Sequence, residues 1–241
     1  MATKIQRYSR GCGFSYTAGF FPTLCLIQNR PDLLRVVYAS KDAVGTEGLN
    51  RIISMVGEDR VVVSDPAVEK LGTKENDHVI GVFSTEEQTL NPESDHVVLV
   101  NPQDMGNVGN AMRTMLAFGY RDLALITPCA DHDNPKAVRA SMGAYFSVRT
   151  QLFDSFDDYI RAYPRTYYPF VLQTDRTLSK LKEIPSERIA LVFGNEARGL
   201  DPSFRNQDAI RIEQSDDVDS LNLTTAIAIA LHDFKYRIVK K

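Results

Sequence analysis

The sequence is short of cysteine, and its few cysteines are not paired by their spacing. Cys12, Cys25 and Cys129 are odd in number, and no two of them stand in a Cys-x-x-Cys arrangement. Disulfide frameworks need an even set of cysteines, and structural zinc sites need closely spaced pairs. The pattern argues against both, so we expect buried or idle thiols and no bound metal.

Long hydrophobic runs are also missing. The longest, such as 97–100 and 189–193, fall far short of the ~20 residues that span a bilayer. The apolar stretch at 20–27 contains Pro22 and has no small-residue cleavage pattern behind it. We therefore expect a cytoplasmic protein with no membrane partner.

The chain has no excess of positive charge. Its formal net charge is -3, with ten Lys and Arg against eleven Asp and Glu in residues 1–90 and eighteen against twenty afterwards. A nucleic-acid-binding protein usually carries a basic footprint. Two interpretations of the basic residues near the start remain open: they form a local basic patch, or they are scattered over the surface. These residues are Lys4, Arg7, Arg10, Arg30 and Arg35.

Two common nucleotide-binding signatures are absent, although the chain is of the α/β class. No Gly-x-Gly-x-x-Gly follows the first strand of the second half, and no Gly-Lys-Ser/Thr occurs anywhere. Short apolar segments alternate with helical patterns there, which favours a buried parallel sheet. Strands are predicted at 97–100, 123–126, 170–172, 189–193 and 209–212, and helices at 109–118, 136–142, 156–162 and from Ser220, an N-cap type, onward.

A polar segment divides the chain. Residues 85–96 are polar and contain a proline, as interdomain linkers do. Upstream we predict a small α/β unit with helices at 22–28 and 48–56 and strands at 35–39, 60–63 and 79–83. We therefore expect one domain over 1–90 and a second over 91–241.

Three polar clusters stand where apolar strands end and helices begin. They occupy 101–113, 194–200 and 220–222. Because ligands bind beyond the carboxyl ends of parallel strands, all three clusters can meet in one site. Asn107 stands at a helix start that attracts anions, and Arg113 lies near enough for its guanidinium to reach a phosphate.

These clusters resemble the three motifs of the SPOUT superfamily, TrmH (SpoU) class. The resemblance covers roughly residues 95–238 and includes the segment 135–144. It implies an S-adenosylmethionine-dependent RNA 2'-O-ribose methyltransferase that acts on tRNA or rRNA. It also implies a C-terminal trefoil knot and a homodimer formed by the knot and the last helix. Residues 15–84 are similar to an L30e-like RNA-binding domain.

The resemblance also implies roles for particular residues. Gly194, Ile212 and Leu221 would offer backbone groups to the cofactor. The residues expected to line or shape that pocket are Asn195, Glu196, Gly199, Leu200 and Asn222. The residues expected at the catalytic centre are Arg113, Asn107, Ser220 and Asn222. Because the pKa of arginine lies above ~12, we favour Arg113 as a phosphate clamp that stabilises a developing alkoxide, with a literal general base as the alternative.

One departure keeps an alternative open. The family usually has Ile-Pro-x where this chain has Ile212-Glu213-Gln214. The change removes a rigid backbone position and adds a charge near the expected adenine loop. The alternative is a non-catalytic RNA- or ribosome-binding relative, and a small-molecule methyltransferase is a third hypothesis. The joint presence of Asn107, Arg113, Glu196, Ser220 and Asn222 favours the enzyme.

Overall fold

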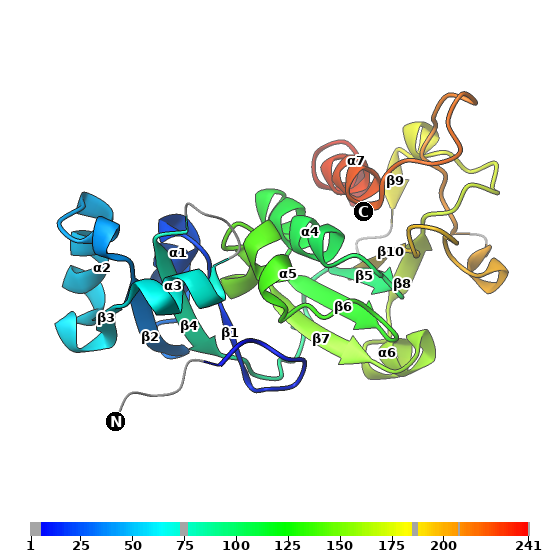
Figure 1. Ribbon diagram of the computed structural model, residues 1–241. Helices are drawn as coiled ribbons and strands as arrows, with labels where there is room; N and C mark the ends of the chain where they lie inside the picture. Colours follow the sequence, from blue (N-terminus) through cyan, green and yellow to red (C-terminus); the bar gives the residue numbers. More distant parts are fainter. Residues whose placement is uncertain (1–5, 73–76, 185–187, 207, 241) are drawn as a thin grey trace. The chain divides into compact units, whose positions relative to one another are not determined.

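The computed structural model describes residues 6–72, 77–184, 188–206 and 208–240 (Figure 1). The chain forms two compact units. One runs up to Glu86 and also includes Asp131–Ser147; the other comprises Glu87–Ala130 and the chain from Val148 onward. The predicted boundary near residue 90 lies close to this division, but the predicted second domain contained 131–147, which the structure groups with the first unit.

The first unit is a four-stranded sheet with helices. The strand order is β1-β4-β2-β3, in which β2 and β3 are parallel and the other pairs are antiparallel. Its core includes Leu26, Val37, Phe83, Val138 and Phe146, and the last two explain why residues 131–147 belong here. The elements are β1 (Phe14–Tyr16), α1 (Phe20–Asn29), β2 (Leu34–Ala39), η1 (Lys41–Ala43), α2 (Glu47–Val56), η2 (Glu58–Arg60), β3 (Val61–Val63), α3 (Asp65–Leu71), β4 (Val79–Ser84), α5 (Pro135–Ala140) and η3 (Ala144–Phe146).

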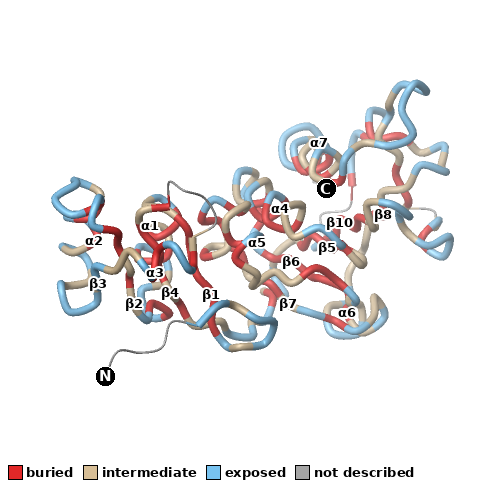
Figure 2. The backbone as a smooth tube through the Cα atoms, in the orientation of Figure 1, coloured by how far each residue is buried: buried red, intermediate tan, exposed pale blue. Residues whose placement is uncertain are grey.

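The second unit contains five parallel strands in the order β7-β6-β5-β10-β8. The predicted α/β class with a parallel sheet is therefore confirmed. The strands β6 and β10 are buried along their whole length, and β5 is buried up to Leu99; Figure 2 shows buried residues in red. The elements are β5 (His96–Val100), α4 (Met105–Ala117), β6 (Asp122–Ile126), β7 (Arg149–Phe153), α6 (Phe156–Ala162), β8 (Thr166–Pro169), η4 (Leu178–Lys180), β9 (Glu183–Ile184), β10 (Ile189–Phe193), η5 (Pro202–Phe204), α7 (Leu223–Tyr236) and β11 (Val239–Lys240).

Two predicted strands of this sheet were wrong. The strand expected at 170–172 is β8, which lies earlier, and Phe170 only bridges to Ile210. The segment 209–212 makes isolated pairings and no strand, because its partners are Pro169 at the end of β8 and residues of the irregular chain after it. The edge strand β7 was not predicted.

Helices cover both faces of the parallel sheet. Tyr159 and Phe156 of α6 pack with Val98, Ala124 and Ala190 on one face. Because side chains alternate along a strand, the neighbouring residues face the opposite side, where Figure 1 shows α4 and α7. The helices α4 and α7 contact each other. None of the helices in the described ranges is long and apolar enough to cross a membrane.

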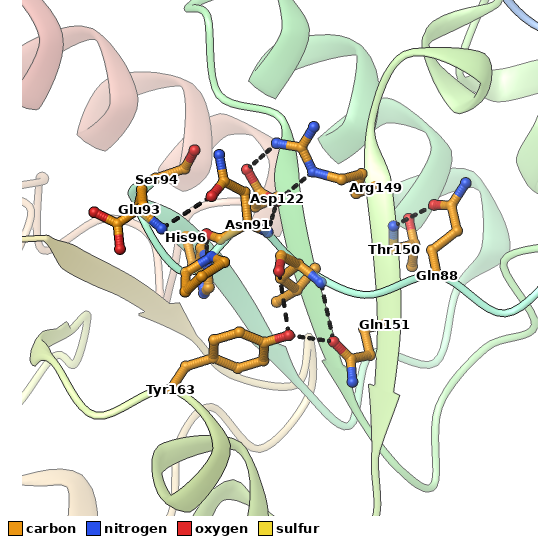
Figure 3. A network of polar contacts seen from close by, with 12 residues as sticks. Gln88, Asn91, Glu93, Ser94, His96, Asp122, Arg149, Thr150, Gln151 and Tyr163 are labelled. Atoms are coloured by element: carbon orange, nitrogen blue, oxygen red, sulfur yellow. Dashed lines mark hydrogen bonds and ion pairs between the residues drawn. The ribbon is translucent and has the colours of Figure 1, made fainter.

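The polar segment after Glu86 is bound to the amino-terminal edge of this sheet (Figure 3). The Asp122 carboxylate is fully buried and accepts hydrogen bonds from Arg149 Nε at 2.7 Å, Arg149 Nη2 at 2.6 Å and Asn91 N at 2.7 Å. Gln151 Oε1 accepts from Leu90 N at 3.1 Å. The segment after Glu86, which has the composition of a linker, is thus held to the sheet of the second unit by hydrogen bonds.

His96 is fully buried in the same network. Its Nε2 lies 2.8 Å from the carbonyl oxygen of Asn91 and must donate, so a neutral ring accepts from the Tyr159 hydroxyl through Nδ1 at 3.0 Å. Burial lowers the pKa of His96 to about 4, against the opposing effect of the hydrogen bond to Asn91. The imidazole is therefore neutral at physiological pH.

Acid is expected to weaken the fold through His96. An unfolded histidine has a pKa near 6.5, so below that pH the unfolded state binds more protons than the folded state. The free energy of unfolding should fall as the pH decreases from 6.5 to 4, by about 2 kcal/mol from this residue. Urea unfolding at pH 7, 6, 5 and 4 measures the loss. A His96→Gln variant should show a smaller loss across this window, and equal losses in both proteins would contradict the assignment.

Candidate functional site

The polar clusters meet at the carboxyl ends of β5 and β10. These two strands are neighbours in the sheet although four strands separate them in the sequence. The chain winds one way from β5 through β6 to β7, and the other way to β10 and β8, so the order reverses between β5 and β10. Such a reversal point is where open parallel sheets bind ligands.

Two asparagines connect the carboxyl ends of β6, β5 and β10. Asn101 follows β5 with φ at 53°, a left-handed conformation that asparagine tolerates, and donates from Nδ2 to the carbonyl of Thr127 at 2.8 Å. Asn195 follows β10 and donates from Nδ2 to the carbonyl of Asn101 at 2.8 Å. The first two clusters are therefore held together by side-chain to backbone hydrogen bonds.

Glu196 fixes the start of α4. Its carboxylate accepts from Gln103 N at 3.1 Å, Asp104 N at 3.3 Å and Asn107 Nδ2 at 3.1 Å. Partial burial tends to raise the pKa of Glu196, but the hydrogen bond from Asn107 and the backbone N–H groups lower it below its usual value. An ionised Glu196 at the positive end of α4 is also favoured by the helix dipole.

The loop after β10 closes on itself and has no room for a side chain at Gly194. Asn195 N donates to the carbonyl of Gly199 at 3.2 Å, and Gly199 N donates to the carbonyl of Asn195 at 2.9 Å. A Cβ at Gly194 would lie 2.2 Å from the carbonyl carbon of Gly199 and 2.4 Å from Leu200 N. Gly199 has φ at +68°, which favours glycine. Both glycines are needed for this loop.

A cavity of about 490 Å³ opens beside this loop, within the usual range for small-molecule sites. Seven of the eight residues expected at the cofactor pocket line this cavity, and so does Ser220, whereas Asn222 does not. The seven are Gly194, Asn195, Glu196, Gly199, Leu200, Ile212 and Leu221. Sequence reasoning missed the wall formed by Phe170, Val171, Leu172 and Gln173, and it missed Arg198, Arg205, Gln214 and Asp219. The wall follows β8, so the rule about strand ends would have found it had that strand been placed correctly.

Three of the predicted catalytic residues do not line the cavity. Asn107 binds Glu196 instead. Asn222 is the N-cap of α7, and its Oδ1 accepts from Thr224 N at 2.8 Å and from Thr224 Oγ1 at 2.6 Å. Arg113 is exposed on α4 and has no hydrogen-bond or ion-pair partner within the described parts of the chain. The prediction of an N-cap at Ser220 was wrong. The N-cap is Asn222, and the helix α7 begins at Leu223.

Removing the cap at Asn222 should destabilise α7. Asn222→Ala is expected to lower the free energy of unfolding by ~1 kcal/mol, because the first turn of the helix loses an acceptor for its free N–H groups. Asn222→Asp keeps such an acceptor and should remain near wild-type stability. Urea unfolding of the three proteins measures the difference, and equal stability of the alanine variant would show that the cap contributes nothing.

Glu213, the departure from the family pattern, turns away from the cavity. Its neighbours Ile212 and Gln214 both line the cavity, whereas the Glu213 carboxylate accepts hydrogen bonds from the backbone N and the hydroxyl of Ser179. The negative charge of Glu213 therefore points to the loop that contains Ser179 and not into the cavity. No group of three or more His, Cys, Asp or Glu that could hold a metal occurs among the residues described.

Comparison with known proteins places this site in a family. Residues 94–232 match the SpoU rRNA Methylase family. An uncharacterized tRNA/rRNA methyltransferase of Synechocystis is 28% identical over 57% of this chain and 51% of its own length. The 23S rRNA (guanosine(2553)-2'-O)-methyltransferase RlmP of Bacillus subtilis is 32% identical over 55% of this chain and 54% of its own length. The aligned segment thus spans about half the length of these relatives.

Solved structures match the fold of both units. The SpoU methyltransferase AviRb of Streptomyces viridochromogenes, in complex with AdoMet, superposes with a TM-score of 0.80 at 19% identity over 94% of this chain and 92% of that chain. An RNA methyltransferase of the TrmH family from Porphyromonas gingivalis, described as putative, gives 0.72 at 24% identity over 92% and 90%.

Proposed function

Since the chain belongs to the SpoU rRNA Methylase family, we propose that it is an S-adenosylmethionine-dependent RNA 2'-O-ribose methyltransferase that acts on tRNA or rRNA. The observation that carries the proposal is the cavity beside the carboxyl ends of β10 and β8, which gathers seven of the eight residues expected at the cofactor pocket. The relatives named as tRNA or rRNA methyltransferases support it. The cytoplasm remains the predicted site of action.

The cavity's lining fits S-adenosylmethionine. Its apolar wall, which includes Phe170, Leu172 and Leu200, suits the adenine ring. Gln173 and Gln214 offer amide groups for hydroxyls, and the charged Asp219 and Arg198 suit an ammonium and a carboxylate. The cofactor supplies a methyl group that its sulfonium charge already activates, so the protein's main contribution is positioning.

Arg113 is proposed to act on the RNA and not on the cofactor. Its exposed guanidinium has no partner among the residues that the structure describes, so it can bind the phosphate beside the acceptor ribose and stabilise the developing alkoxide. Asn107 is proposed to support it from the first turn of the same helix, with Ser220 and Asn222 at the opposite side of the centre. Glu196 holds Asn107 in place.

We further propose a homodimer in which a second copy completes the site. In one chain Arg113 lies outside the cavity, while α4, which carries it, packs against the last helix, α7. Both helices present exposed groups, including Ile229 and Tyr236 on α7. Light scattering at micromolar concentration should give twice the chain mass, and a monomeric mass would oppose this arrangement.

The first unit is proposed to bind the RNA substrate as an L30e-like domain, and the trefoil knot remains a prediction from the family resemblance. The proposed activity is tested by incubating the protein with S-adenosylmethionine and unmodified tRNA or rRNA transcripts, followed by nucleoside mass spectrometry. We expect 2'-O-methylated nucleosides in one of the two pools.

The alternative hypothesis, a non-catalytic RNA-binding relative, predicts a different result in this assay. It would be supported by saturable RNA binding without methyl transfer and without cofactor binding. The feature that motivated it, Glu213, is engaged with Ser179 and does not line the cavity, so it no longer favours this alternative.

A further inference from the structure

Glu213 belongs to a pairing between two irregular segments beside the cavity. Leu178 N donates to the carbonyl of Arg211 at 2.8 Å, and Arg211 N donates to the carbonyl of Arg176 at 2.9 Å. These two hydrogen bonds form an isolated bridge between Thr177 and Arg211, and no further backbone pairing joins the two segments among the residues that the structure describes. Glu213 extends the pairing by one step with its side chain, through Ser179.

The segment that receives Glu213 is itself fixed to α7. Arg237 forms an ion pair with Asp233 at 2.7 Å on that helix. Its guanidinium also donates to the carbonyl oxygens of Leu178 at 2.5 Å and Leu181 at 2.9 Å. The backbone on both sides of Ser179 is therefore held by Arg237. The chain that follows Glu213, in contrast, is exposed at residues 215–220.

Alternation along an extended chain connects Glu213 with the cavity. Successive side chains point to opposite sides, so Ile212 and Gln214 face the cavity while Glu213 faces Ser179. Burial, the largest single effect, raises the pKa of Glu213, but the hydrogen bonds from Ser179 and from backbone N–H groups together outweigh it and bring that pKa to about 2. The carboxylate is thus ionised at neutral pH and makes charge-assisted hydrogen bonds, which are stronger than neutral ones.

We propose that Glu213 is a positioning residue for the cofactor cavity, which holds the backbone of Ile212 and Gln214 in place by anchoring it to Ser179. Where a proline would restrict this backbone covalently, the carboxylate restrains it through hydrogen bonds to the 177–181 segment. The inference rests on the proposed function in taking S-adenosylmethionine as the ligand of the cavity.

A double-mutant cycle on the full chain tests this role. The Kd of S-adenosylhomocysteine, which occupies the same site without reacting, is measured by calorimetry for wild type, Glu213→Ala, Ser179→Ala and the double variant. We expect Glu213→Ala to weaken binding about tenfold, and the double variant to be no weaker than Glu213→Ala, because both changes remove one contact. Glu213→Gln keeps an acceptor oxygen and should recover part of the affinity.

The control is Asp216→Ala, which removes a negative charge from the same exposed stretch without touching Ser179. It should bind like wild type, which separates anchoring from a simple change in net charge. Thermal unfolding of each variant identifies any that merely fail to fold, and Glu213→Gln then provides the readout. Wild-type affinity in Glu213→Ala, or additive effects in the double variant, would overturn the proposal. Failure of the wild type to bind would instead count against the proposed cofactor.

Discussion

Gly194→Ala is expected to weaken binding of S-adenosylhomocysteine severely. A methyl group at this position would lie 2.2 Å from the carbonyl carbon of Gly199, and both overlapping groups are backbone that cannot rotate away. The loop must therefore open, which breaks the reciprocal hydrogen bonds between Asn195 and Gly199 and moves the cavity wall. Calorimetry should show a Kd raised at least 100-fold, or about 2.7 kcal/mol.

Two glycines with positive φ provide matched controls. Gly199→Ala meets no atom within 4 Å but forces φ at +68° on an alanine, so we expect a smaller loss of affinity that reflects strain of roughly 1–2 kcal/mol. Gly119→Ala carries the same kind of strain at φ +82° in a turn outside the cavity, and should lower stability without changing the Kd. Unchanged affinity in Gly194→Ala would refute the placement of the ligand beside this loop.

The buried strands of the second unit were predictable because their sequences are apolar on both faces. β5, β6 and β10 match the predicted segments within one residue. β7 was not predicted because it is an edge strand with polar residues. Arg149 binds Asp122 and Gln151 binds Leu90, so neither side chain enters an apolar core. The segment 209–212 has apolar residues on either side of Arg211, but it pairs only with the last residue of β8 and with the irregular chain that follows it.

The first unit shows a similar limit. The apolar segment 60–63 is typical of a buried strand, yet Val62 and Val63 of β3 are 43% and 49% exposed because the strand lies at the edge of the sheet. The strand β1 and the helix α3 were missed. α3 does carry a local signal, since Ser64 caps it and proline stands in its first turn.

The site was predictable as far as local motifs define it. The glycines and the asparagine after β10 mark the cavity, those after β5 lie outside its lining, and the family resemblance gives the order of the motifs along the chain. The sequence does not reveal which polar groups satisfy one another. Glu196 caps α4 from across the site, and Glu213 binds Ser179, 34 residues away in the chain. Such partners depend on the fold and follow no fixed spacing.

Arg113→Ala is expected to lower the rate of methyl transfer 10²- to 10³-fold, while the Kd of S-adenosylhomocysteine stays at the wild-type value. The reason is that Arg113 lies outside the cavity that holds the cofactor, whereas removal of one donor that stabilises developing negative charge typically costs this much. Single-turnover assays with saturating RNA measure the chemical step, and calorimetry measures the cofactor affinity.

The two roles considered for Arg113 predict different results for lysine at this position. A phosphate clamp depends on positive charge, so Arg113→Lys should retain a substantial part of the rate, with some loss because lysine lacks the planar fork. A literal general base would instead give a lysine variant whose rate rises steeply with pH as the amine deprotonates. Arg161→Ala, which removes an exposed arginine of α6 paired with Asp158, is the control and should leave the rate unchanged. Equal rates for Arg113→Ala and wild type would exclude Arg113 from the catalytic centre and direct attention to Ser220, which lines the cavity.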